Sequence, residues 1–206
     1  MTEPLSFARL DIRVDLPALK ADLQRIRELP WINHVNQRDY SGEWDVMPMR
    51  CPAHYREAHP ILQGFAIESC DDWVDLPVLE QSPGLQRLLA SLRCPLKSVR
   101  LMRLRPGAEI KPHRDHGVSL EHGEARLHVP IESHELLEFW VNDHLVPMQE
   151  GELWYLNVDQ THAVLNRGDC DRINLVIDCV ADEWLREKIE TSLLTCQGRY
   201  FDELCP

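Results

Sequence analysis

The chain has 206 residues, 44% of them hydrophobic and 27% charged, a balance typical of a single globular domain. Its formal net charge of −12 at pH 7 argues against nucleic acid and anionic membrane surfaces as partners, because both would repel it. The seven cysteines form no Cys-x-x-Cys pair, no signal-peptide pattern opens the chain, and no run is long enough to cross a bilayer. We therefore expect a cytoplasmic protein with reduced thiols; no sequence feature predicts its oligomeric state.

The first part of the chain combines helices with stretches of no clear period. Leu5–Val14 alternates roughly, as a strand would, and Asp15 can cap a helix with an apolar stripe that ends near Pro30. Residues 31–63 are rich in Pro, His and aromatic side chains, which predicts loops and short strands. A second helix is expected over 84–92.

After residue 97, short apolar runs follow one another with turn residues between them. They predict strands at Val99–Leu104, Glu109–His113, Ala125–Ile131, Leu136–Val141, Leu145–Met148, Leu153–Leu156, His162–Leu165 and Arg172–Val180. Such spacing indicates a sandwich, a jelly roll or a barrel. A last helix, capped near Asp182, should cover Trp184–Leu194. We expect one domain over 1–206, with N-terminal helical and irregular support in 1–96, a core in 97–180 and a C-terminal helix in 181–206.

A His-x-Asp triplet at His113 and Asp115 is a candidate for metal binding. On an extended backbone, side chains two residues apart share a face, so both can reach one metal ion. With a distant second histidine they would form a 2-His-1-carboxylate triad, which leaves coordination positions open for reactants. The triplet alone is weak, because roughly one is expected by chance with ten histidines, and His122 with Glu124 makes a similar decoy.

The segment around His162 strengthens the candidate. Asn166–Asp169 has the composition of a hairpin turn, which would place His162 opposite Arg172 on one face. An arginine beside a metal ligand indicates an anion between them, such as a dicarboxylate that chelates the metal and meets the guanidinium. Arg126 and His128 also share one face of an apolar strand. These patterns predict a polar barrel interior that holds a ligand.

In combination, these motifs resemble the aspartyl/asparaginyl β-hydroxylase family of Fe(II)- and 2-oxoglutarate-dependent oxygenases. In chain order the matching segments are His113-Arg-Asp115-His-Gly, Arg126-Leu-His128, Gly151-Glu-Leu-Trp154-Tyr-Leu-Asn157, and His162 with Arg172 ten residues on. The sequence is most similar in style to bacterial hydroxylases of free amino acids, such as proline cis-4-hydroxylases. The animal aspartyl hydroxylase has a glycine where Asp115 stands, which weakens any transfer of its substrate to this chain.

The resemblance implies a mainly β fold with flanking helices, a double-stranded β-helix of the jelly-roll, cupin-like kind. It also implies six site residues: His113, Asp115 and His162 as the Fe(II) ligands, Arg172 at the distal carboxylate of 2-oxoglutarate, and Arg126 with His128 at the cosubstrate site. With O2 as the further reactant, the chain would be a dioxygenase that hydroxylates an unactivated C–H bond of a small molecule, a free amino acid or amino-acid derivative.

Three residues are candidates for contact with the substrate. Arg50 could receive a carboxylate, and His116 and Trp154 lie close in sequence to ligand-bearing motifs, although a surface arginine and a core tryptophan are the ordinary alternatives. Five further histidines, His34 among them, have no predicted role.

Three other functions stay open. They are a non-catalytic jelly-roll sensor of small acids, a zinc hydrolase or cupin isomerase, and a hydroxylase of an Asp or Asn residue in a peptide or protein. Open metal positions argue against the sensor, and two arginines directed at a dicarboxylate argue against the zinc enzyme.

Overall fold

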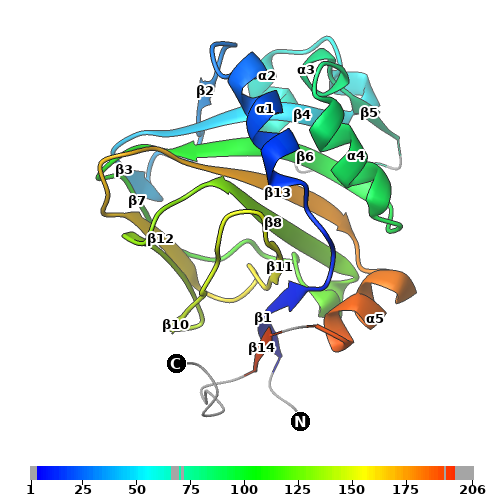
Figure 1. Cartoon of the computed structure of the whole chain (residues 1–206), viewed down its shortest axis with the longest axis vertical. Helices are drawn as coiled ribbons and strands as arrows, with labels where there is room; N and C mark the ends of the chain where they lie inside the picture. Colours follow the sequence, from blue (N-terminus) through cyan, green and yellow to red (C-terminus); the bar gives the residue numbers. More distant parts are fainter. Residues whose placement is uncertain (1–3, 66–69, 71, 193, 198–206) are drawn as a thin grey trace.

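The computed structural model describes residues 4–65, 70, 72–192 and 194–197, and its strands form two antiparallel sheets packed face to face (Figure 1). The large sheet runs β14 (Leu194–Gln197), β1 (Leu5–Leu10), β11 (Leu153–Leu156), β8 (Glu124–Glu132), β13 (Arg172–Val180), β6 (Leu96–Leu104), β4 (Trp44–Pro52) and β2 (Ile32–Asn33), with β5 (Trp73–Asp75) on β4. The small sheet runs β10 (His144–Leu145), β9 (Leu137–Val141), β12 (His162–Asn166), β7 (Glu109–His113) and β3 (Tyr40–Ser41). The mainly β, jelly-roll fold predicted from the sequence is confirmed.

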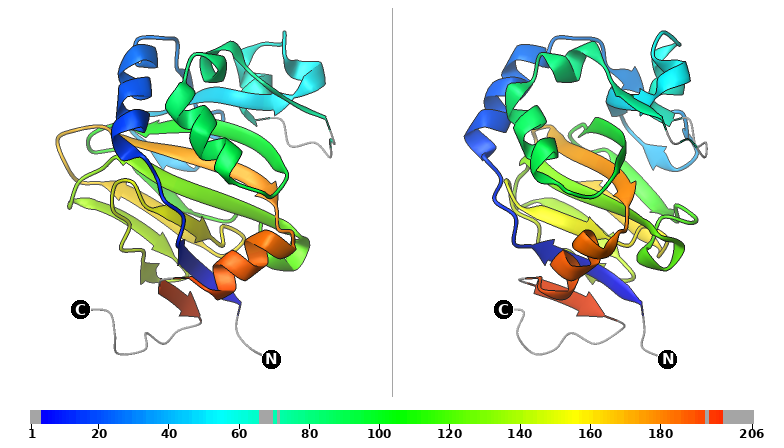
Figure 2. Two further views of the ribbon diagram at one scale, coloured as in Figure 1. Left: turned by 45° about the vertical axis from the view of Figure 1, so that its right-hand side comes forward. Right: turned by 90° about the vertical axis from the view of Figure 1, so that its right-hand side faces the viewer.

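Among the described helices, α2 (Pro60–Phe65) packs on β4 beside Val46, which belongs to the inner core. Two short 3-10 turns span Ala53–Tyr55 and Leu120–His122. The other helices, α1 (Leu16–Ile26), α3 (Pro77–Glu80), α4 (Pro83–Ser91) and α5 (Glu183–Glu190), cover the outer face of the large sheet. In both views of Figure 2, α1 and α4 lie across that face, while β1 and β14 lie at the opposite end of the molecule from α2. The side chain of Asp15 caps α1 as predicted, by accepting from the backbone N–H of Ala18. None of the described helices is both long and apolar enough to span a membrane.

Two hydrophobic cores follow from the alternation of side chains along the strands. On β8, Leu127, Val129 and Ile131 belong to the core between the large sheet and the helices. The alternate residues of β8, which include Arg126 and His128, face the small sheet. The inner core, between the two sheets, contains Trp44, Phe139, Trp154 and Val164. The polar residues of the predicted site therefore lie on the inner face.

Four strands from the N-terminal part, β1, β2, β4 and β5, belong to the large sheet, although residues 1–96 were expected to form helical and irregular support. β4, within the predicted loops of 31–63, is nine residues long and pairs with β6, β2 and β5. Almost all of β4 is buried, so its apolar residues show no period of two. Pro48 also argues against a strand, because proline is uncommon inside a sheet. A register shift between Pro48 and Arg50 accommodates the proline.

The C-terminal helix is shorter than predicted. α5 ends at Glu190 rather than at Leu194, and β14 then adds a strand beside β1. β10 is likewise shorter than the strand expected over 145–148. Residues 198–206, placed by the sequence prediction in the C-terminal helical region, lie outside the described residues.

Candidate metal centre

The pairing of β7 with β12 brings together the three predicted metal ligands. His162 lies directly opposite His113 in the register, and their ring centroids are 4.2 Å apart. The potential ligand atoms of His113, Asp115 and His162 all lie within 4.8 Å of one another. Asp115 follows the end of β7, where its backbone N–H donates to the carbonyl of Val158 at 2.9 Å. Two imidazoles and one carboxylate at this spacing match the donor set that non-haem Fe(II) takes.

Backbone carbonyls fix how the two imidazoles point. Nδ1 of His113 lies 2.8 Å from the carbonyl oxygen of Lys111, and Nδ1 of His162 lies 3.1 Å from that of Gln160. A carbonyl oxygen only accepts, so each Nδ1 carries the proton and each Nε2 keeps a free electron pair for a metal. Burial, and then the neighbouring His113, lower the pKa of His162 to about 4, so this ligand stays neutral at physiological pH.

The predicted hairpin between His162 and Arg172 is wrong. β12 pairs with β9 and β7 in the small sheet, whereas β13 pairs with β6 and β8 in the large one. The turn after Asn166 therefore crosses from one sheet to the other. Arg172 still faces the metal side of the interior, because the guanidinium Cζ lies 5.8 Å from the ring centroid of Phe139, which stacks against His162 at 6.3 Å.

Arg172 carries a buried charge without an ion-pair partner among the residues that the structure describes. Its exposure is 2%, and its Nε has no hydrogen-bond partner there. Burial alone lowers the pKa of Arg172 to about 9, which leaves the guanidinium charged at neutral pH. Because burying an unpaired charge costs several kcal/mol, roughly, this arrangement favours an anionic ligand. The residues therefore fit a dicarboxylate that reaches from the metal to Arg172.

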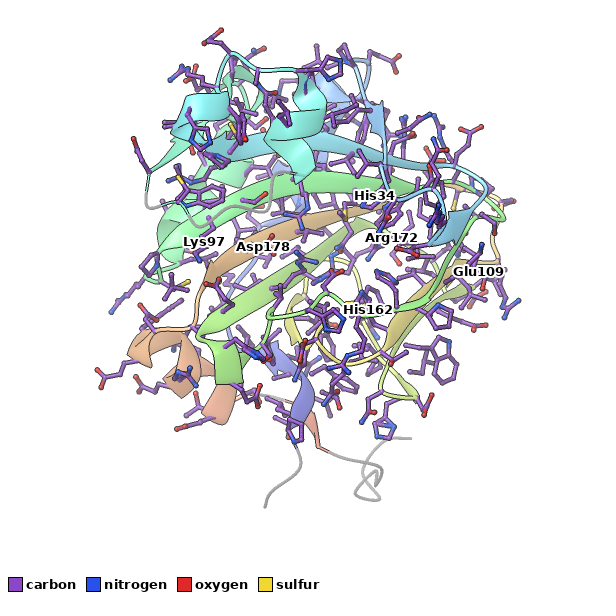
Figure 3. All side chains as sticks on the ribbon, turned by 180° about the vertical axis from the view of Figure 1, so that it is seen from behind. His34, Lys97, Glu109, His162, Arg172 and Asp178 are labelled. Atoms are coloured by element: carbon purple, nitrogen blue, oxygen red, sulfur yellow. The ribbon has the colours of Figure 1, made fainter. Side chains whose placement is uncertain are left out.

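His128 lies beside Arg172 on the inner face of the large sheet. Its ring is buried, Nδ1 lies 2.8 Å from the side-chain amide of Asn174, and Nε2 has no partner in the described part of the chain. Burial and then the charge of Arg172 hold the pKa of His128 well below its usual value, so the ring is neutral. Figure 3 shows Arg172 and His162 grouped with His34 near the middle of the face in view.

Arg126 contacts the metal ligand Asp115 directly. Its Nη1 donates to Oδ2 of Asp115, and its Nε donates to Oδ1 of Asp178 at 2.6 Å. Asp178 also accepts from Arg100 at 2.7 Å, which makes a chain of alternating charges. Burial would raise the pKa of Asp115, but the Arg126 guanidinium outweighs it and holds that pKa below the usual value. Asp115 is therefore ionised, and its Oδ1, 3.8 Å from Nε2 of His113, is directed toward the other ligands.

The three predicted substrate residues have different surroundings. Arg50 forms an ion pair with Asp75 on β5. The His116 side chain is 81% exposed and lies 3.8 Å from Asp159. Trp154 is fully buried, and although it sits opposite His128 on the neighbouring strand, its Nε1 donates to Glu152 at 3.0 Å.

Sequence reasoning missed four residues around the site. They are Asn174 and Asp178 on β13, Arg100 on β6 and His34. The first two continue the period of two that begins at Arg172, which is a signal that could have found them. His34 stacks on Trp44 with ring centroids 3.5 Å apart. Burial, followed by the charge of Arg100, lowers the pKa of His34 to about 3, so His34 lies close to the same charged residues. No sequence motif marks His34 as a site residue.

Comparisons with known proteins identify the family of the chain and structures that share its fold. Residues 10–182 match the family described as Aspartyl/Asparaginyl beta-hydroxylase. A solved structure of an oxidoreductase of the 2OG-Fe(II) oxygenase family from Burkholderia pseudomallei is 15% identical, with a TM-score of 0.51 and coverage of 79% of each chain. SnoN, a non-heme alpha ketoglutarate dependent epimerase from nogalamycin biosynthesis, is 11% identical, with a TM-score of 0.51 and coverage of 85% of this chain and 77% of its own. At these identities the two structures establish the shared fold.

Proposed function

Because the chain belongs to the aspartyl/asparaginyl β-hydroxylase family, we propose that it is an Fe(II)- and 2-oxoglutarate-dependent dioxygenase that hydroxylates a free amino acid or a closely related small acid. One observation carries this proposal. The buried Arg172, with no ion-pair partner among the described residues, lies on the inner face near the His113, Asp115 and His162 triad, which supports a chelating dicarboxylate between them.

The protein's own groups bind and orient the reactants. Bound Fe(II), with 2-oxoglutarate and O2, would supply the oxidising chemistry, so that the substrate gains a hydroxyl group while 2-oxoglutarate leaves as succinate and CO2. His113, Asp115 and His162 would hold the metal, and Arg172 would fix the far carboxylate of the cosubstrate. The Phe139 ring, near both Arg172 and His162, would form an apolar wall of the cosubstrate site.

The charges next to the metal support an acidic substrate. Arg100 and Arg126 share one aspartate, Asp178, so this group carries a surplus positive charge. Asp115 also bonds to Arg126, but a bound metal cation would offset its charge. Asp75 pairs with Arg50, whereas Arg100 must share Asp178 with Arg126, so we place the substrate carboxylate at Arg100. His34 on Trp44 would form a wall of the same space.

The first experiment is succinate production from 2-oxoglutarate with Fe(II), ascorbate and air, across a panel of free amino acids. We expect one amino acid or a few related ones to stimulate turnover, and His113→Ala to abolish it. His122→Ala is the matched control, since His122 is an exposed histidine of the decoy triplet and should leave turnover unchanged.

The other outcomes separate the competing functions. Iron-dependent turnover that no amino acid stimulates would retain the oxygenase but move the substrate to peptides or other metabolites. Binding of 2-oxoglutarate without any turnover would favour a sensor of small acids. If 2-oxoglutarate neither binds nor reacts with Fe(II) present, the proposed function is wrong.

A further inference from the structure

Asn174 contacts both Arg172 and His128, the polar residues that the large sheet contributes to the site. It is completely buried on β13, two residues after Arg172 and on the same face. Its neighbour across the strand pair is Pro130 on β8, and His128 lies two residues before that. The alternation along β13 marks Asn174 as an inward-facing polar residue, and the proposed function gives it no role.

The orientation of the Asn174 amide follows from its neighbours. With its oxygen toward the site, it accepts from Nδ1 of His128 at 2.8 Å and from Nη2 of Arg172 at 3.3 Å, while its nitrogen donates to the carbonyl of Val129 at 3.1 Å. The opposite orientation would direct the amide oxygen at the Val129 carbonyl and the amide nitrogen at an arginine donor. A single amide oxygen therefore joins His128 to Arg172.

This bond sets the tautomer of His128. Because Nδ1 donates to the amide oxygen, the neutral ring keeps its proton on Nδ1 and presents Nε2 as an acceptor. An incoming carboxylate is itself an acceptor, so it finds its partner in Arg172 rather than in the imidazole. Arg172, in turn, is oriented without losing its charge, since an amide is neutral.

We propose that Asn174 is a positioning residue of the cosubstrate site, which orients Arg172 and His128 through one neutral oxygen and thereby sets the preference for a dicarboxylate. This inference rests on the proposed function and names the residue that makes its cosubstrate site selective. An aspartate at this position would keep the bonds from His128 and Arg172 but lose the donor to the Val129 carbonyl. Its charge would pair with Arg172 and compete with the ligand.

The test is direct binding, measured by calorimetry on protein loaded with Mn(II), a metal that allows binding without turnover. Two ligands are compared: 2-oxoglutarate, which has a distal carboxylate, and 2-oxobutanoate, which lacks one. Asn174→Asp should weaken 2-oxoglutarate at least about tenfold, since a charged hydrogen-bonded contact is lost. Its affinity for 2-oxobutanoate and for Mn(II) should stay within about threefold of wild type.

Asn166→Asp is the matched control. Asn166 is also a buried asparagine, lies 3.0 Å through Oδ1 from a histidine, His134, and is outside the site at the end of β12. Its variant should bind both acids as wild type does. If Asn174→Asp does not fold, Asn174→Ala provides the comparison, with an expected loss of a few-fold for 2-oxoglutarate, roughly, and none for 2-oxobutanoate.

Two results would overturn the inference while leaving the proposed function intact. One is an Asn174→Asp variant that binds 2-oxoglutarate as wild type does, or that weakens both acids equally. The other is a long-range 1H–15N spectrum of the wild-type protein, with no ligand added, that places the His128 proton on Nε2. Wild-type protein that binds Mn(II) but not 2-oxoglutarate would instead contradict the proposed function, and this inference with it.

Discussion

Arg172 would bind the cosubstrate, but its buried charge lowers the stability of the ligand-free fold. A buried guanidinium with no carboxylate beside it in the described structure destabilises the ligand-free fold, since its charge is only partly compensated. We expect Arg172→Met to weaken 2-oxoglutarate by at least about a hundredfold. The free energy of unfolding of the metal-free protein should stay the same or rise by up to about 2 kcal/mol. Urea unfolding and calorimetry measure the two quantities; a large loss of stability would show that Arg172 is chiefly structural.

The buried His128 and His162 and the half-buried His34 make the metal-free protein sensitive to acid. Burial, first among several causes, lowers the pKa of His34 to about 3, of His162 to about 4 and of His128 well below its usual value. The unfolded chain takes up these protons near pH 6.5 and the folded chain does not, so stability is full above that pH and falls as pH drops toward 4.

The contribution of His34 can be isolated by substitution. His34→Asn should reduce the slope of unfolding free energy against pH, between about pH 4.5 and 6, by up to about 1.4 kcal/mol per pH unit. Urea unfolding of metal-free protein at several pH values provides the measurement, since metal binding has a pH dependence of its own. An unchanged slope would mean that His34 is not buried in a neutral form.

At the scale of the elements, a close contact between α1 and α4 supports the large sheet from outside. The backbone N–H of Leu85 donates to the buried Asp22 at 2.8 Å, and a Cβ on Gly84 would lie 2.8 Å from the carbonyl oxygen of Ala18. Gly84→Ala should therefore force the helices apart and cost about 2 kcal/mol.

Gly64→Ala is the comparison for that change. Gly64 also lies in a helix, α2, but an added Cβ would make only ordinary contacts, the nearest at 3.6 Å. This variant should be neutral or slightly more stable, because alanine favours helix. Thermal unfolding of both proteins checks the pair, and equal stabilities would contradict the helix contact.

The sequence predicts elements whose pattern is local, and it misses arrangements that depend on distant partners. α1 is predicted correctly because its cap and apolar stripe lie within its own residues. The assignment of β12 to the small sheet depends on pairing with β7 and β9, which the turn residues after Asn166 do not encode. The metal triad survives that error, because His113 and His162 face the same interior in either arrangement.

At the scale of the whole molecule, the two sheets contribute different halves of the site. Two of the three predicted metal ligands, His113 and His162, lie on the small sheet, and Arg172, Asn174 and His128 lie on the large one. A ligand that reaches from the metal to Arg172 would therefore join the sheets. We expect Mn(II) alone to raise the melting temperature, and 2-oxoglutarate to raise it much further only when Mn(II) is present.

Thermal scans with each ligand alone and with both check this coupling. At a concentration about a hundredfold above its dissociation constant, each bound ligand should add about 2.7 kcal/mol. If Mn(II) and 2-oxoglutarate each raised the melting temperature independently of the other, they would bind at separate sites. Arg172→Met should keep the effect of the metal and lose that of 2-oxoglutarate.

The direct pairing of His113 with His162 would also couple metal binding to the register of β12 during folding. A slip of β12 by one residue would turn Ala163 inward and His162 to the outer face. A chain in that register could not gather three ligands, so it would bind iron far more weakly than the native one. By mass action, iron would draw misregistered chains back to the native pairing. Metal binding would thus favour the native register of β12 as the barrel assembles.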